Sequence, residues 1–160
     1  MVFVTVGSQK FPFDRLLRAV DECVANGVIQ EEVFAQTGAC EYTPENYRYV
    51  TFINRGEFAS YMEAADVVLT HGGTGVIVNA LKSGKHVIAM ARLSCFGEHV
   101  DDHQIQLLEE FEKAGLILTC NNASTLAEAY REAINCPSAI YRSNNSAFVA
   151  DLDSYLRRAY

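Results

Sequence analysis

Short apolar runs alternate along this chain with stretches in which apolar residues recur every three or four positions. The first run, residues 2–6, predicts a buried strand. A Gly-Ser turn follows it, and apolar residues at helical spacing then predict a helix that ends at Gly27. These apolar residues are Phe13, Leu16, Leu17, Val20 and Val24. Strand, turn and helix form the first unit of the predicted fold.

The same alternation continues through the rest of the sequence. Further strands are predicted at residues 33–37, 49–53, 67–70, 86–91 and 116–119. Further helices are predicted at residues 58–65, 76–81, 105–111 and 125–134, the last from the capping-box spacing of Thr125 and Glu128. A final amphipathic helix is expected at about 146–159, where it either covers this domain or docks on a partner.

Strands that alternate with helices at this spacing predict an α/β domain, a Rossmann-like parallel sheet with helices on both faces. No repeat, low-complexity tract or linker interrupts the chain, so we expect residues 1–160 to form a single domain. Ligands of such sheets bind beyond the carboxyl ends of the strands. The unusual residues of this sequence follow strands in that way, which makes this edge the expected site.

Composition narrows the function. Thirteen Lys and Arg against twenty Asp and Glu leave a formal charge of −7, which disfavours a nucleic-acid surface or polybasic membrane docking. The five cysteines are scattered, without a C-x-x-C pair, and predict reduced thiols. No signal peptide or membrane-length apolar run is recognisable. We therefore expect a cytoplasmic protein, and any association with a membrane must come through a partner.

A glycine-rich turn follows the predicted strand at 67–70 and opens the next helix. It consists of His71, Gly72, Gly73, Thr74 and Gly75. Glycines let backbone approach a ligand closely, and the first amides of a helix have no partner within it, so a diphosphate could bind here without lysine. A plain tight turn explains the glycines equally well. A nicotinamide site fits poorly, because the dinucleotide fingerprint belongs after the first strand with a different glycine spacing.

A polar segment precedes and enters the helix near residue 105. Asp101 and Asp102 suit a helix N-terminus, while His103 and Gln104 could hydrogen-bond the hydroxyl groups of a polar ligand. His99 and His103 have the i, i+4 spacing of metal ligands on a helix, but the segment spans a helix boundary. We therefore expect no metal and no cofactor.

Two more loops belong to the same predicted edge. Gly7-Ser8 follows the first strand, and Gln36-Thr37-Gly38 follows the second. Each alone is explained by ordinary turning between strand and helix. Their convergence with the two segments above predicts one binding site.

These segments together resemble one glycosyltransferase family in order and spacing, over residues 1 to about 134. Members of this family are similar to the C-terminal, UDP-sugar-binding half of GT-B enzymes. Its members include small soluble catalytic subunits of bacterial capsular or exopolysaccharide synthesis and of the eukaryotic two-part UDP-GlcNAc transferase. The runs that carry the resemblance are 4–8 with 13–17, 36–38, 65–75, 91–92 and 96–104.

The resemblance implies a role for each matching residue. It places the nucleotide diphosphate on Gly7, Ser8 and the turn 71–75, and the donor sugar near His103 and Gln104. It also includes Gln36, Gly38, Arg92, His99 and Asp102 in the donor-binding set. Asn79 stands where larger relatives have a ribose-binding Glu, which is a departure from the family pattern.

The resemblance also implies a reaction and partners. We expect a catalytic, donor-binding subunit of a two-component inverting hexosyltransferase, which moves a sugar from a UDP-sugar to a lipid-linked saccharide acceptor. His71 would support the leaving group, and a membrane-anchored, acceptor-binding glycosyltransferase subunit would supply the general base. Whether the isolated chain forms homo-oligomers stays open. The alternatives are a non-catalytic nucleotide-binding or regulatory subunit, and a redox or metal protein using Cys95, His99 and His103.

Overall fold

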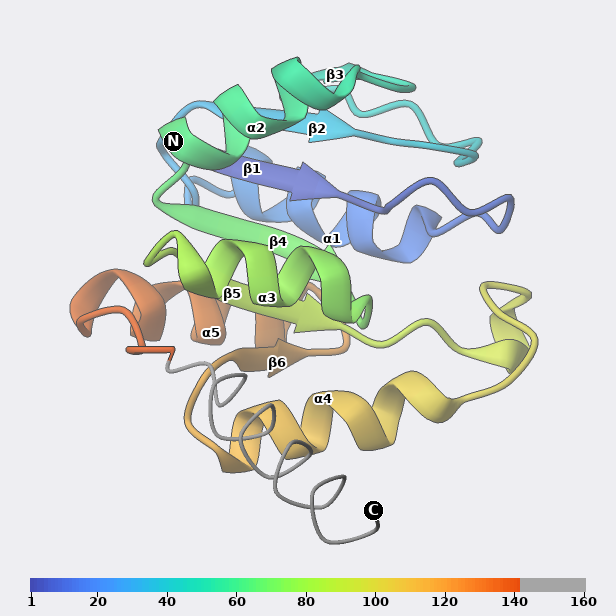
Figure 1. Ribbon diagram of the computed structural model, residues 1–160. Coiled ribbons are helices and arrows are strands. Elements are labelled where there is room, and N and C mark those ends of the chain that lie inside the picture. The colour runs from blue at the N-terminus through green and yellow to red at the C-terminus, as the bar shows by residue number, and fades with distance from the viewer. Residues whose placement is uncertain (142–160) are drawn as a thin grey trace, which may run out of the picture.

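The computed structural model describes residues 1–141, and the helix expected at 146–159 lies outside them (Figure 1). The six strands are β1 (Val2–Thr5), β2 (Val33–Gln36), β3 (Arg48–Val50), β4 (Val67–His71), β5 (His86–Met90) and β6 (Leu118–Cys120). The five α-helices are α1 (Asp14–Ala25), α2 (Arg55–Ala64), α3 (Thr74–Lys82), α4 (His103–Lys113) and α5 (Ala123–Asn135), and Ser94–Phe96 forms one 3₁₀ turn.

The strands form one sheet in the order β3-β2-β1-β4-β5-β6, and every neighbouring pair is parallel. This confirms the Rossmann-like α/β fold. Because all strands run the same way, their carboxyl ends share one edge, from which the loops after β1, β2, β4 and β5 emerge (Figure 1).

Side chains of each central strand point alternately to the two faces of the sheet, and each face has its own core. Val2 and Val4 of β1 pack in the cluster under α1 and α5. Phe3, between them, packs in the cluster under α2, α3 and α4. Figure 1 shows the same layers, with α1 and α5 behind the sheet and α2, α3 and α4 in front. Burial on both faces explains why these strands are continuous apolar runs.

Several predicted boundaries are wrong: strand β3, for example, ends at Val50 rather than at residue 53. Two others, in α5 and β6, have a visible cause. Helix α5 starts earlier, because the Asn122 side chain accepts from Thr125 N at 3.0 Å while Thr125 Oγ1 accepts from Asn122 N at 3.2 Å. The capping box is therefore Asn122 with Thr125, and not Thr125 with Glu128. Strand β6 starts at Leu118 rather than Leu116, because Leu116 N still bonds to Phe111 O at the end of α4. Among the described residues, no helix is long and apolar enough to cross a bilayer.

Candidate donor-binding site at the carboxyl edge

The site forms where the sheet changes its direction of winding. Strands β1 and β4 are neighbours, yet the chain continues from β1 toward β2 and from β4 toward β5. The loops after β1 and β4 therefore diverge and leave a crevice between them, which is the usual ligand position in open α/β sheets. Gly7 and Ser8 follow β1, and the turn from His71 to Gly75 follows β4. The structure brings these two predicted segments together.

The N-terminus of α3 presents free backbone donors at this crevice. Gly73 is the N-cap in extended conformation, and no side chain caps the helix. The amides of Thr74, Gly75 and Val76 make no hydrogen bond within the described residues. A Cβ at Gly75 would meet nothing within 4 Å, so the backbone is open to an approaching group. Three free amides and the positive end of the helix dipole suit an anion such as a diphosphate.

His71 lies just beneath this turn. It is 8% exposed, and its Nδ1 lies 3.3 Å from Thr70 Oγ1, which itself donates to Thr5 O at 3.0 Å. Burial, together with the nearby positive charge of Arg92, lowers the pKa of His71 to about 4. The imidazole is therefore neutral near neutral pH. It can donate one hydrogen bond but brings no positive charge to a ligand.

The glycines of the site make room for side chains as well as for a ligand. A Cβ at Gly73 would lie 2.4 Å from His71 Nε2, and a Cβ at Gly7 would lie 2.7 Å from His71 Cε1. A Cβ at Gly72 would lie 2.7 Å from Gln104 Cβ. Packing inside the protein thus favours glycine at positions 7, 72 and 73, and at Gly7 the positive φ of 77° favours it as well. Their role in ligand approach stays a prediction.

Gln104 joins the turn after β4 to the loop after β5. Its Oε1 accepts from Gly72 N at 3.0 Å and from Arg92 N at 3.1 Å, and the residue is only 3% exposed. The predicted role in reading a sugar hydroxyl would fall to its Nε2, which makes no hydrogen bond within residues 1–141. In this structure the Oε1 atom holds the backbone of Gly72 next to that of Arg92.

Arg92 lies below the site rather than on its surface. The side chain is 1% exposed, and its guanidinium donates to four backbone oxygens, those of Val6, Phe11, Pro12 and Glu98, at 2.6 to 3.1 Å. It also lies over the Phe13 ring, 4.9 Å from the centroid. Burial lowers the pKa of this guanidinium below its usual value. Arg92 therefore ties the loops after β1 and β5 together from within, and its contact with the donor stays a prediction.

Arg15 and Glu98 form a second support, which the sequence prediction missed. Arg15 Nε and Nη2 donate to the two carboxylate oxygens of Glu98 at 3.1 and 2.8 Å, and Arg15 also reaches the backbone oxygens of Ala91 and Asn121. Glu98 in turn accepts from Leu93 N. Both residues belong to the runs that carry the resemblance, but residue type alone does not show that an Arg and a Glu 83 positions apart are paired.

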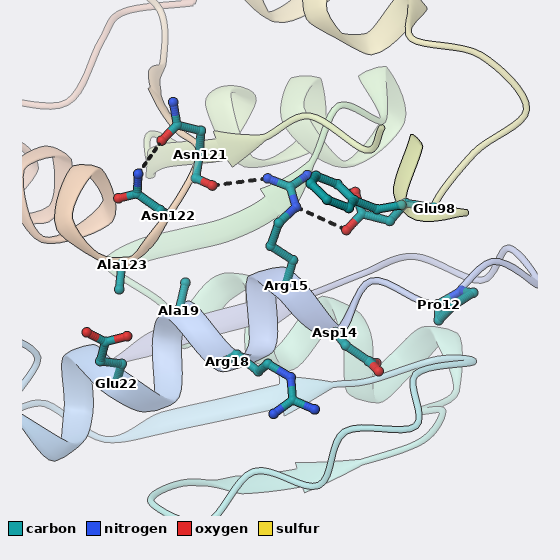
Figure 2. Close-up of a pocket in the computed structure, with 11 residues that line it drawn as sticks. Pro12, Asp14, Arg15, Arg18, Ala19, Glu22, Glu98, Asn121, Asn122 and Ala123 are labelled. Carbon is teal, nitrogen blue, oxygen red and sulfur yellow. Dashed lines mark hydrogen bonds and ion pairs between the residues drawn. The ribbon is translucent and has the colours of Figure 1, made fainter. Parts of the chain in front are cut away.

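A cavity of about 440 Å³ flanks this pair (Figure 2). Figure 2 shows Arg15 rising from α1 toward Glu98 and Asn121, with Glu22 and Ala19 facing Ala123 along the same helix. The cavity lies between α1, the 96–98 loop and the start of α5. None of the predicted donor-binding residues lines it.

The remaining predicted residues have different positions. Gln36 Nε2 donates to Gly7 O at 3.4 Å, and a Cβ at Gly38 would lie 2.9 Å from the same oxygen, so both support Gly7 from below. Asn79 lies farther away: five residues along α3 from Thr74, about 7.5 Å of helix axis, in a hollow that Ser83 and Lys85 also line.

His99, Asp101 and His103 gather at the start of α4. Asp101 Oδ1 lies 3.2 Å from His99 Nδ1 and is hydrogen-bonded to His103 Nδ1. The hydrogen bond from His103 is the main cause that lowers the pKa of Asp101. Asp102, the N-cap residue, accepts from Ser94 N at 2.7 Å and so holds the 3₁₀ turn against the helix. Cys95, considered with the two histidines as a metal ligand, is not part of this group.

Comparison with known proteins identifies related chains. The family model described as the glycosyltransferase family 28 C-terminal domain matches residues 1–155. A curated relative from Yarrowia lipolytica, named UDP-N-acetylglucosamine transferase subunit ALG13, is 34% identical over 64 residues. That stretch covers 39% of this chain and 31% of the relative, so the match spans about a third of the curated protein.

Solved structures share the fold. The crystal structure described as the glycotransferase of kitacinnamycin aligns with a TM-score of 0.62 and 18% identity, over 85% of this chain and 35% of that one. The NMR solution structure of ALG13 aligns with a TM-score of 0.59 and 18% identity, over 92% of both chains. At this identity the likeness shows the fold, which is that of GT-B glycosyltransferases.

Proposed function

The chain belongs to glycosyltransferase family 28, as a C-terminal domain of that family. On that premise we propose that it is the donor-binding, catalytic subunit of a two-component inverting glycosyltransferase. The donor is a UDP-sugar and the acceptor a lipid-linked saccharide. The observation that carries this proposal is the uncapped N-terminus of α3, which offers the amides of Thr74, Gly75 and Val76 at the crevice between β1 and β4.

The donor phosphates would bind these amides. The net charge of −7 attracts no anion, so the local donors must supply the attraction. His71 is held neutral by burial and can add a hydrogen bond, while Arg92 contributes its charge from beneath the loops. All of these groups are fixed before the ligand arrives, which is the condition for strong electrostatic stabilisation of a leaving group.

We propose an inverting transfer at this site. An acceptor hydroxyl oxygen attacks the anomeric carbon, the bond from that carbon to the diphosphate oxygen breaks, and UDP leaves with the electron pair from the opposite face. Configuration inverts, and the hydroxyl proton passes to a general base. We assign that base to a membrane-anchored glycosyltransferase partner, which also binds the lipid-linked acceptor.

Two facts support a partner. The curated Yarrowia lipolytica relative is named a subunit of a UDP-N-acetylglucosamine transferase. The kitacinnamycin glycotransferase has a further 65% of its chain beyond the region aligned with this one, because the alignment covers 35% of it. We propose that a second subunit takes the place of that further part, and that the complex works at the inner face of the cytoplasmic membrane in capsular or exopolysaccharide synthesis. UDP-GlcNAc is the first donor to test.

Binding of UDP to Thr74 variants tests the site at single-amide level. Thr74 is the first residue of α3, where proline is well tolerated, and Gly73 before it already has the extended conformation that proline requires. Thr74→Pro therefore removes one amide donor with little change to the helix, while the control Thr74→Ala removes the hydroxyl and keeps the amide.

We expect calorimetry to show UDP binding to the wild type and to Thr74→Ala, and binding at least about tenfold weaker to Thr74→Pro, from the loss of one hydrogen bond to a charged group. Thermal shift should show UDP stabilising the same two proteins. Absence of UDP binding to the wild type would refute the proposal and favour a regulatory subunit that merely stabilises its partner.

A further inference from the structure

We propose that His99, Asp101 and His103 bind one divalent transition-metal ion. Their ligand atoms all lie within 4.8 Å of one another, which is the only such group of three among the described residues. Two imidazoles and one carboxylate are the donor types that zinc and its neighbours in the first transition row prefer. This inference reverses the expectation from the sequence that no metal is bound, and it replaces Cys95 by Asp101 in the ligand set.

The distances suit one small ion. Zinc lies about 2.0 to 2.1 Å from imidazole nitrogen and about 2.0 to 2.2 Å from carboxylate oxygen, so two ligand atoms of a tetrahedral site are about 3.3 Å apart. His99 Nδ1 and Asp101 Oδ1 are 3.2 Å apart. His103 and Asp101 are hydrogen-bonded in the structure and must separate slightly to admit the ion. Both side chains are more than half exposed, so a small rotation suffices.

The surroundings form a site with one closed and one open side. The His99 side chain is 10% exposed, and its ring lies 5.7 Å from that of Phe11. Asp101 and His103 lie on the solvent side. Three protein ligands beside open space leave a fourth coordination position free for water or a ligand oxygen.

The cluster adjoins the proposed donor site through the chain itself. His103 is followed by Gln104, whose Oε1 bonds to Gly72 N in the turn after β4.

Metal binding is tested first without nucleotide. The protein, stripped with a chelator, is titrated with Co²⁺ and followed by visible absorption, and Zn²⁺ binding is measured by competition. We expect one equivalent of Co²⁺ per chain in tetrahedral or five-coordinate form, without the near-ultraviolet absorption of cobalt bound to thiolate. His99→Gln, Asp101→Asn and His103→Gln should each weaken binding at least about tenfold, since loss of even an outer partner of a ligand costs that much.

His86→Gln is the matched control, because it removes a histidine from the start of β5, at the opposite edge of the sheet. Thermal melting of every variant in chelator separates loss of binding from loss of folding. A wild type that binds no cobalt, or binds it equally well after all three substitutions, overturns the inference, as does a thiolate spectrum. Metal binding without UDP binding would leave this inference standing and refute the proposed function, while UDP binding without metal binding would do the reverse.

Discussion

The imidazole of His71 packs directly on the backbone of Gly73, so that a methyl group at Gly73 would lie 2.4 Å from His71 Nε2. The glycine that ends the turn after β4 is thus required by a histidine two positions earlier. Because Gly73 has φ of −82°, a conformation that any residue adopts, this requirement is one of space and not of backbone strain. The backbone of the turn can therefore take this course only because residue 73 has no side chain that would meet the His71 imidazole.

Gly73→Ala should therefore destabilise the protein by about 1 to 3 kcal/mol, as overpacking of a dense region does. In a His71→Ala background the same substitution should cost much less, because the ring that it meets is gone. Urea unfolding of the two single variants and the double variant measures this coupling. The control is Gly75→Ala, which meets no atom within 4 Å and should be neutral or stabilising. Equal costs in both backgrounds would contradict the proposed contact.

The low pKa of His71 predicts a specific loss of stability in acid. A histidine in the unfolded chain has a pKa of about 6.5, and burial lowers that of His71 to about 4 in the folded protein. Between these values the unfolded state binds a proton that the folded state does not. The free energy of unfolding therefore falls as the pH falls from about 6.5 to about 4, by about 3 kcal/mol from this residue.

A comparison with His71→Gln isolates that contribution. Both proteins share every other titrating group, so chemical unfolding at several pH values should show the wild type losing about 3 kcal/mol more than the variant over this range. Parallel stability curves for the two proteins would show that the folded protein leaves His71 at its ordinary pKa.

Gln104→Leu removes the acceptor of two buried amides. Gly72 N and Arg92 N would then be unpaired, which costs about 1 to 3 kcal/mol for each amide that water cannot reach. Unfolding in urea measures the loss, and UDP affinity should fall as well, because the turn after β4 loses its anchor. Gln106→Leu, an exposed position two residues along α4, is the control and should change stability little. A Gln104→Leu protein as stable as this control would contradict the supporting role.

The Arg15–Glu98 pair should matter far more than an ion pair at the surface. Glu98 has a side chain only 5% exposed, so Glu98→Ala leaves the charge of Arg15 without its carboxylate and Leu93 N without its acceptor, and should cost about 3 kcal/mol. The exposed pair of Arg48 and Glu32 is the control, and Glu32→Ala should cost less than about 1 kcal/mol. Thermal or urea unfolding compares the two, and similar losses would argue against a buried network around Glu98.

The order of strands and helices was predictable from the chain, because strands buried on both faces are short apolar runs and the helices keep one apolar stripe. The residues at which these strands and helices begin and end were harder to predict. Asn122 and Thr125 cap each other, and this reciprocal pair competes with the capping box suggested by Thr125 and Glu128. Both spacings are present in the sequence, and only the conformation at Asn122 decides between them.

Segments of the site were predictable in the same way, since each follows a strand whose end lies at one known edge. The role of each side chain was not. Gln104 was expected to bind a ligand because it begins a helix at the carboxyl edge, and Arg92 because the resemblance includes it in the donor-binding set. Both are buried and hold backbone groups. Asp101 was seen as a helix-start residue, and it lies between two histidines.

The sequence alone determined the parallel sheet and which segments meet at its carboxyl edge, where the candidate site lies, because hydrophobic period and turn residues are local properties. The tertiary structure alone decided which of those residues face outward as free donors and which are enclosed. That division depends on contacts between residues far apart in the chain, such as Arg15 with Glu98 and Arg92 with Val6. No local pattern records such contacts, since they arise only when the loops after different strands are packed against one another.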